Sequence, residues 1–227
     1  MTKPRVQVDA LVIGSFMIAT LILVFLLPNF HNDNEMLRSI CAVIGFVLIV
    51  FGALFRMSAR GYKKFCSNQG FALVTQGPYK FVRNPMYLGT FLIGVGFMFP
   101  LFPLWTIVVF STMFYFRFII QIKKEETTLF EKFGQDYREY CQRVSPFIPT
   151  LKSFSDVKFN EVFSKEHLWS TKEKYGLFYW PFLNLVFWFF EQKIIWHEYT
   201  LFPIIADAVF VLALLGWMVA NTFSAKS

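Results

Sequence analysis

The sequence predicts an all-α, polytopic membrane protein with about six transmembrane helices in a single domain. Hydrophobic residues make up 56% of its 227 residues and charged residues only 16%, whereas a soluble domain carries about 25% charged residues. The charged residues gather at the ends of long uncharged runs. The net charge of +7 therefore fits membrane topology and anionic lipid better than nucleic acid.

Two apolar runs near the N-terminus predict the first two spans. Residues 10–27 are uncharged and follow Lys3 and Arg5. A secretory signal peptide has a shorter apolar region and a small-residue cleavage site, so we expect this span to be retained. Residues 39–55 form the second run, and Arg56 begins a basic segment after it. Because basic residues favour the cytoplasmic face, we expect the N-terminus and the end of the second span to lie in the cytoplasm.

The apolar run from Met86 to Phe116 predicts a helical hairpin. Its 31 uncharged residues would extend about 46 Å as one helix, which exceeds the roughly 30 Å thickness of the hydrocarbon core. Pro100 and Pro103 lie near its middle, where proline interrupts a helix. The run is flanked on both sides by basic residues, namely Lys80, Arg83, Lys123 and Lys124. We therefore expect two helices with a turn at Pro100–Pro103, and one steeply tilted, kinked helix is the alternative.

An amphipathic pattern follows the hairpin. Five side chains recur at helical intervals with polar residues between them: Leu129, Phe133, Tyr137, Tyr140 and Val144. We expect them to form a cytoplasmic amphipathic helix. Gly134 lies inside this helix and weakens it by about 1 kcal/mol relative to alanine, so we expect a close contact to explain the glycine.

The remaining segments are two polar linkers and two C-terminal spans. Residues 61–76 are too polar to cross the membrane and form either an interfacial segment or a solvated linker. Residues 175–190 and 200–223 predict the last two spans, which return the C-terminus to the cytoplasm. Asp207 is the one charge in the last run. Because a carboxylate inside a span is costly, we expect Asp207 to face other helices.

Two motifs on either side of the hairpin carry the functional signal. They are GPYKFVRNPMYLG at residues 77–89 and EETTLFEKFGQDYREYCQRVSPFIP at residues 125–149. Their order and spacing resemble the integral-membrane methyltransferases typified by isoprenylcysteine carboxyl methyltransferase and the phospholipid N-methyltransferases, with the pattern GPYxxVRHPxYxG, a helical hairpin and RxxxEExxLxxxFGxxYxxYxxRVxxxIP. The resemblance separates a motif region, 77–149, from an N-terminal part, 1–76, and a C-terminal part, 150–227.

This resemblance implies a methyltransferase that takes S-adenosylmethionine from the cytosol and a lipophilic acceptor from the bilayer. The implied cofactor contacts are Tyr79, Arg83, Asn84, Tyr87, Gly94, Gly96, Glu125 and Glu126. Carboxylates suit the ribose diol or the ammonium of this cofactor, a guanidinium suits its carboxylate, and aromatic faces suit its sulfonium. The acceptor stays open among a prenylcysteine-type carboxylate, a lipid amine and a small thiol.

Two departures from the family pattern bear on catalysis. Asn84 replaces the usual histidine, and Gln121 stands where an arginine often precedes the glutamate pair. Asparagine forms hydrogen bonds but does not titrate. Either the family's histidine only holds the cofactor, or this protein uses another base or an acceptor that needs none, such as a carboxylate or thiolate. Arg117, one turn before Gln121 on the same helix face, is a candidate for the missing cation, so Arg83, Asn84 and Arg117 are the catalytic candidates.

Each of these residues also has a structural interpretation. The KKEE run at residues 123–126 is compatible with ion pairs on a solvated face. Arg83 is compatible with snorkelling to the interface, and Tyr79 and Tyr87 with interfacial aromatics. The glycines of residues 94–96 permit close helix packing in a membrane.

Two other classes of function remain as alternatives. Membrane sterol reductases share an RHPxY-type segment and bind a nicotinamide cofactor, NADPH, but resemble RDxxCxxKYGxxWxxYC after their hairpin, where this chain has EExxLxxxFGxxY. A non-catalytic scaffold or transporter is the second alternative. The histidines, His31, His167 and His197, are far apart and the three cysteines have no ligand spacing, so we expect no metal site.

Overall fold

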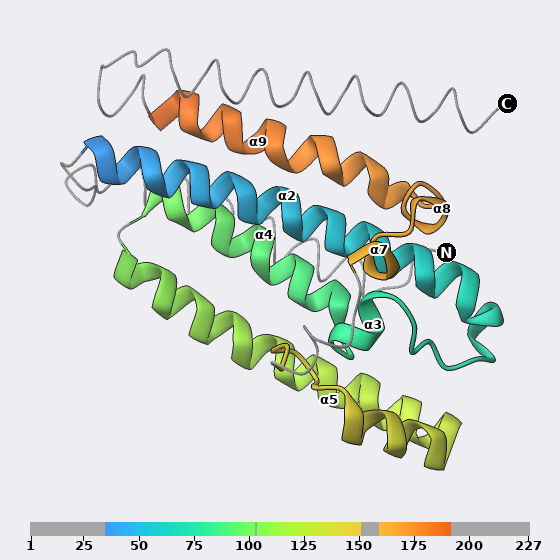
Figure 1. Ribbon diagram of the computed structural model, residues 1–227. Coiled ribbons are helices and arrows are strands. Elements are labelled where there is room, and N and C mark those ends of the chain that lie inside the picture. Colours follow the sequence, from blue (N-terminus) through green and yellow to red (C-terminus); the bar gives the residue numbers. More distant parts are fainter. Residues whose placement is uncertain (1–34, 103, 151–158, 192–227) are drawn as a thin grey trace, which may run out of the picture.

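The regular structure of the computed structural model is helical (Figure 1). The model describes residues 35–102, 104–150 and 159–191. Its helices are α2 (Glu35–Cys66), α3 (Pro78–Phe81), α4 (Pro85–Leu101), α5 (Leu104–Arg143), α7 (Phe159–Val162), α8 (Lys165–Leu168) and α9 (Gly176–Glu191), with 3-10 turns η2 (Asn68–Gly70) and η3 (Lys172–Tyr175). The all-α prediction is confirmed for these residues, which contain no strand. The predicted spans at 10–27 and 200–223, and Asp207 with them, lie outside the described residues.

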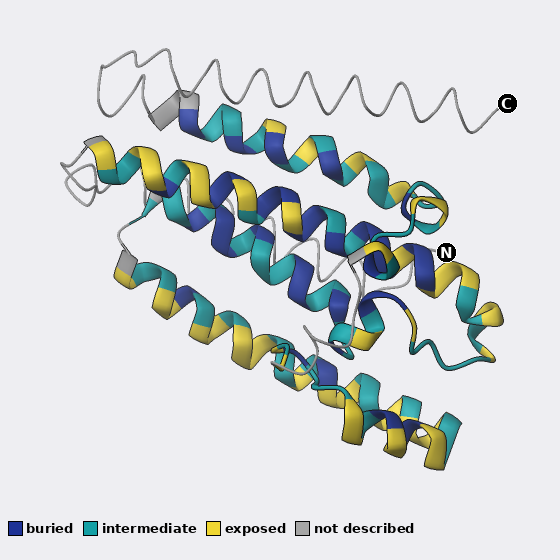
Figure 2. Cartoon of the chain, viewed as in Figure 1, coloured by how far each residue is buried: buried dark blue, intermediate teal, exposed yellow. Residues whose placement is uncertain are grey.

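Among the described residues, the two helices α2 and α5 are long and apolar enough to cross a membrane, and α4 is a shorter apolar helix. Large apolar side chains follow the outer face of α5 at helical spacing and are exposed, among them Val108, Met113 and Phe116 (Figure 2). Such a stripe is costly in water and stable against lipid. The apolar helices thus support a membrane protein. α2 also continues past the predicted end of the second span at Phe55 and carries the following basic residues, so the first part of the 61–76 linker is helical.

The helices α2 and α4 pack through two pairs of facing glycines. A Cβ on Gly52 would lie 2.7 Å from the carbonyl oxygen of Gly89, and a Cβ on Gly45 would clash with the carbonyl oxygen of Gly96. Because any side chain would push the two helices apart, small residues are required at this interface. This close contact explains Gly89, the last residue of the first motif.

The hairpin prediction is confirmed, and the single tilted helix is excluded. α4 ends at Leu101, where Phe102 adopts an extended conformation, and α5 begins at Leu104. The two helices then run side by side, with Val95 and Met98 of α4 packed against Phe110 of α5. The two helices are thus antiparallel, so the residues before α4 and those in the middle of α5 meet at the same end of the hairpin.

A single amphipathic helix from Leu129 to Val144 is not confirmed, because the chain reverses direction at Gly134. This residue has φ 51° and ψ −117°, a conformation that breaks α5 in two. Phe147 contacts Phe118 at a ring-centroid distance of 6.2 Å, whereas a straight helix would carry position 147 about 44 Å past position 118. Residues 135–149, which we call the return arm, therefore fold back onto the hairpin.

The expectation that a close contact explains Gly134 is wrong. A Cβ built on Gly134 meets nothing within 4 Å, so no close contact excludes a side chain. The positive φ is what requires glycine, since other residues are strained there. The glycine in the second motif thus makes the reversal possible.

The C-terminal part of the described chain packs on the other side of the α2–α4 pair from α5 (Figure 1). Leu177 of α9 is buried in the same hydrophobic cluster as Phe46 and Val50 of α2. The preceding short helices cover the end of α2, where Ser58 donates to the carbonyl of Val162. These contacts hold the end of α2 and the following α3 in place beside the hairpin mouth.

Candidate active site

The glutamate pair lies on α5 at the mouth of the hairpin and reaches two different partners, one just before α4 and one in its first turn. Glu126 forms an ion pair with Arg83, and Glu125 accepts a hydrogen bond from the hydroxyl of Tyr87 at 2.7 Å. Because adjacent helix positions point about 100° apart, the two carboxylates diverge toward separate donors. The two sequence motifs, 38 and 43 residues apart at these contacts, therefore meet in one site.

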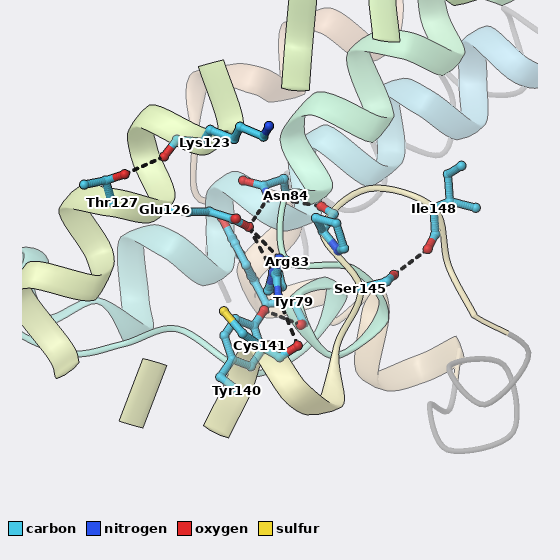
Figure 3. Close-up of polar contacts among 11 residues, drawn as sticks. Tyr79, Arg83, Asn84, Lys123, Glu126, Thr127, Tyr140, Cys141, Ser145 and Ile148 are labelled. Atoms are coloured by element: carbon cyan, nitrogen blue, oxygen red, sulfur yellow. Dashed lines mark hydrogen bonds and ion pairs between the residues drawn. The ribbon is translucent and has the colours of Figure 1, made fainter. Parts of the chain in front are cut away.

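Arg83 is the most connected residue of the site. Its Nε and Nη2 lie 2.9 Å from the same Glu126 oxygen, Oε1, and its Nη1 donates to the carbonyl of Cys141 at 3.0 Å. Its backbone N–H donates to the carbonyl of Ser145 at 2.8 Å. Figure 3 shows Arg83 between Glu126 and the return arm. A planar guanidinium with a fixed fork of donors is suited to join these segments, as an ammonium is not.

Asn84 also connects the start of α4 to the return arm. Its Nδ2 donates to the carbonyl of Pro146 at 3.0 Å and lies 3.5 Å from Glu126 Oε1. A neutral amide satisfies both acceptors without carrying a proton to or from a substrate. The geometry therefore favours the interpretation in which the residue at this position holds the site together.

Glu125 has a second donor at a position where the chain departs from the family pattern. Gln121, one turn earlier on α5, donates from Nε2 to Glu125 Oε1 at 3.3 Å, and the same oxygen accepts from Tyr87. Gln121 thus lies within the site, where it orients a carboxylate. The Tyr87 ring packs on Phe118 at a centroid distance of 5.1 Å, which fixes the direction of its hydroxyl.

Tyr79 belongs to the packing around the site and not to its carboxylate contacts. Its hydroxyl donates to the carbonyl of Ala59 on α2 at 3.3 Å, and its own carbonyl accepts from the Tyr140 hydroxyl at 2.6 Å. Burial raises the pKa of Tyr79 above its usual value, because the phenolate would be desolvated. Tyr79 therefore ties α3 to α2 and to the return arm.

The three remaining predicted site residues are Arg117, Gly94 and Gly96. Arg117 is exposed on α5, two turns before Glu125. Gly94 faces Phe110 of α5, and Gly96 faces Gly45 of α2. Close helix packing accounts for both glycines, so a cofactor contact at Gly94 or Gly96 stays a prediction that the packing does not require.

The solvated KKEE interpretation does not describe the pair. Lys123 and Lys124 are exposed, and within the described part of the chain their ammonium groups form no ion pair with either glutamate. Their carbonyls accept hydrogen bonds from Thr127 and Thr128 in ordinary helical geometry. The glutamates point to α4, whereas the lysines point to solvent.

Sequence reasoning missed the backbone acceptors of the return arm and a second polar cluster. The carbonyls of Cys141, Ser145 and Pro146 have no residue-type signature, because every residue carries one. The second cluster joins Arg56 of α2 to Glu173 of η3 at 3.3 Å and to the Thr90 hydroxyl of α4. In the sequence Arg56 indicates only the cytoplasmic end of the second span, and Glu173 lies beyond the motifs. No sequence spacing therefore predicts the contact between Arg56 and Glu173.

The acceptor atoms of the site are of the kind that would hold S-adenosylmethionine. Glu126 accepts its hydrogen bonds and ion pair on Oε1, so its Oε2 receives none from the described residues. A carboxylate held by one oxygen presents the other in a fixed direction, as a ribose diol or an ammonium requires. Glu126 is also partly open, with 22% of its side chain exposed.

Fold and site together define an all-helical membrane protein with a carboxylate pair at the mouth of a helical hairpin. Residues 40–131 match the model of the isoprenylcysteine carboxyl methyltransferase (ICMT) family. This segment of the chain is therefore similar to that family. The matched segment contains α4 and both glutamates, but it ends before Gly134 and the return arm.

Several curated proteins resemble the same part of the chain. A Protein-S-isoprenylcysteine O-methyltransferase of Xenopus laevis is 29% identical over 119 residues, 49% of this chain and 41% of that protein. The protein of the same name from Saccharomyces cerevisiae is 29% identical over 136 residues, 56% of this chain and 57% of its own length. Methanethiol S-methyltransferase 1 of Bradyrhizobium diazoefficiens is 39% identical over 77 residues, 33% of this chain and 25% of that protein.

The chain spans about half the length, or less, of these three relatives: 41%, 57% and 25%. No solved structure matches it at comparable significance.

Proposed function

We propose that this chain is a membrane-embedded methyltransferase that uses S-adenosylmethionine and methylates a lipophilic acceptor, either a prenylcysteine-type carboxylate, a lipid amine or a small thiol. One observation carries the proposal: Glu126 with Arg83, and Glu125 with Tyr87, bring the two motifs into a single cluster at the hairpin mouth. The names of the relatives, which are O- and S-methyltransferases, agree with this chemistry.

In this proposal the chain's own residues bind and orient the cofactor. S-adenosylmethionine supplies a methyl group already activated on a sulfonium. Glu126 Oε2 and Glu125 are placed to accept from the ribose diol or the ammonium, and the Tyr87 ring offers a face to positive charge. Arg83 holds Glu126 and the return arm. Positioning alone can contribute roughly 7–11 kcal/mol to such a transfer.

The acceptor in this proposal reacts as an anion. Asn84 does not titrate, and its amide is hydrogen-bonded to the Pro146 carbonyl. A carboxylate is already ionised at pH 7 and a thiol loses its proton to solvent in part, whereas an ammonium, with its higher pKa, does so far less. The neutral amide at position 84 therefore favours the carboxylate and the thiolate over the lipid amine.

The site is proposed to face the cytoplasm. Exposed basic residues surround the hairpin mouth, including Lys80, Lys123 and Lys124, and basic residues favour the cytoplasmic face. S-adenosylmethionine would then enter from the cytosol and the acceptor from the bilayer. Six spans with both termini in the cytoplasm complete the proposed topology.

Cofactor binding and methyl transfer test the proposal together. Purified full-length protein in detergent is titrated by calorimetry with S-adenosylhomocysteine and, separately, with NADPH. Membranes are then incubated with methyl-labelled S-adenosylmethionine, and the labelled product is identified by mass spectrometry. We expect saturable binding of S-adenosylhomocysteine and a labelled small molecule. Binding of NADPH alone would favour the reductase, and binding of neither would favour the scaffold.

A further inference from the structure

The tip of the return arm places an aromatic ring inside the hairpin. Phe147 is 4% exposed, although it lies in a connecting segment outside any helix. Its ring centroid lies 5.5 Å from that of Phe91 on α4 and 6.2 Å from those of Tyr115 and Phe118 on α5. Phe147 therefore lies between α4 and α5 and contacts both.

Other rings extend this contact to the carboxylate pair. Phe118 lies 5.1 Å from Tyr87, the partner of Glu125, and 4.6 Å from Phe114. Phe114 and Phe91 are 6.4 Å apart across the hairpin. These centroid distances are those of rings in van der Waals contact. The interior of the hairpin directly beside the site is thus filled by side chains.

Hydrogen bonds hold Phe147 in this position. The two residues before it are both tied to the start of α4: the Ser145 carbonyl accepts from the Arg83 N–H at 2.8 Å, and the Pro146 carbonyl accepts from Asn84 at 3.0 Å. Withdrawal of the ring would break these bonds and expose the apolar surface around it. The ring is therefore part of the site's rigid wall.

We propose that Phe147 is a specificity-determining residue that closes the interior of the hairpin to a long lipid chain, so that the acceptor is a small thiol. This inference rests on the proposed function. A prenyl chain would have to lie between α4 and α5 to bring its head group to Glu125 and Tyr87 along this route, and Phe147 occupies that path. A thiol with few carbon atoms needs no such path.

Two features of the sequence agree with this restriction. Position 147 is one of the unspecified positions in the RVxxxIP pattern, where Arg143, Val144, Ile148 and Pro149 carry the match, so the pattern does not require a bulky ring here. The similarity to a methanethiol S-methyltransferase, 39% identical over 77 residues, comes from a protein whose named acceptor is small.

The chemistry of a thiol acceptor suits the site. The thiol first loses its proton to solvent, and the thiolate sulfur then forms the new bond to the methyl carbon while the donor's carbon–sulfur bond breaks, with its electron pair left on the donor sulfur. The products are a neutral thioether and S-adenosylhomocysteine, and the transfer step moves no proton. The non-titrating Asn84 is compatible with this step.

Two measurements on the full-length protein in detergent test the proposal. The first is photo-crosslinking by S-farnesylcysteine bearing a diazirine on its chain, with the labelled residues mapped by mass spectrometry. The second is the ratio of kcat/KM for N-acetyl-S-farnesylcysteine to that for methanethiol. Phe147→Ala is compared with wild type and with Phe110→Ala, which removes a buried ring near the hairpin turn. Phe147→Leu is the second variant, because it keeps more of the buried apolar volume.

We expect no labelling of Phe114 or Phe118 in the wild type and clear labelling in the Phe147 variants. The acceptor ratio should rise at least tenfold in those variants and not in Phe110→Ala, a difference that general loss of stability would not produce. Labelling of the hairpin interior in the wild type, or equal ratios in all variants, would overturn the proposal. If no protein methylates either acceptor, the proposed function fails, while the crosslinking result still decides whether Phe147 closes the hairpin.

Discussion

Arg83 contacts a single oxygen of Glu126 through both Nε and Nη2, at 2.9 Å each, across 43 residues of sequence. Only 11% of the arginine side chain and 22% of the glutamate side chain are exposed. Because the same guanidinium reaches the Cys141 carbonyl, this pair joins the segment just before α4 to α5 and to the return arm. The site is therefore pre-assembled by the protein's own charges.

Replacement of Arg83 by lysine tests this role. An ammonium cannot donate to Glu126 and the Cys141 carbonyl with the same geometry, so we expect the protein to lose roughly 1.5–3 kcal/mol of stability. The measurement is the apparent melting temperature in one detergent. Arg60→Lys is the matched control, since Arg60 is exposed on α2. Equal melting temperatures for the two variants would contradict the positioning role.

The glutamates and the neighbouring lysines should differ in their effect on cofactor affinity. Glu125→Gln and Glu126→Gln should each weaken S-adenosylhomocysteine binding by about 1.5–3 kcal/mol, since a hydrogen bond to a charged group is lost. This is roughly a tenfold to more than a hundredfold change in Kd. Lys123→Gln and Lys124→Gln should change it little, because exposed ion pairs contribute about 0–1 kcal/mol. Calorimetry on the four variants makes the comparison, and equal, small effects at all four positions would argue against the glutamates as cofactor ligands.

Gly134→Ala should destabilise the return arm. Its φ of 51° and ψ of −117° strain any residue with a Cβ, at a cost of order 1–3 kcal/mol. The added methyl group meets no neighbour within 4 Å, so the effect is conformational and not steric. Limited proteolysis of the arm and the melting temperature report it. Gln135→Ala, at the exposed next position, should leave both unchanged, and an equally stable Gly134→Ala would show that the reversal tolerates a side chain.

Gly52→Ala should separate α2 from α4. The new Cβ would lie 2.7 Å from the Gly89 carbonyl oxygen and 2.9 Å from an Ile93 side-chain carbon, so the helices must shift. Overpacking of this kind costs about 1–3 kcal/mol. A lower melting temperature is expected than for Val47→Ala, whose side chain is exposed on α2. If the two variants melt together, the close glycine contact is not a determinant of stability.

The hairpin predicts that Lys80 and Lys123 lie on one side of the membrane. Both are exposed, before α4 and within α5 respectively, and the hairpin brings these segments to the same end. Single cysteines at 80 and 123, in a background without Cys41, Cys66 and Cys141, should react together with an impermeant maleimide. Labelling from opposite sides would contradict both the hairpin and the site at its mouth.

The sequence alone determined the helical class, the hairpin and the residues at its mouth. Composition and run length are local properties, and the two prolines with basic flanks leave a long apolar run few alternatives. The resemblance of the two motifs then selected Arg83, Asn84, Tyr87, Glu125 and Glu126, which the structure brings together. Their pairing across 38 to 43 residues follows from the hairpin geometry.

The tertiary structure decided the features that depend on backbone direction and long-range contact. Helical periodicity continues through Gly134, so the pattern from Leu129 to Val144 gave no sign of a reversal, which depends on one positive φ. The acceptors for Arg83 and Asn84 are carbonyls of the return arm, and a carbonyl is the same in every residue. The position of Phe147 follows from that reversal, since only a chain that turns back at Gly134 carries a ring into the hairpin.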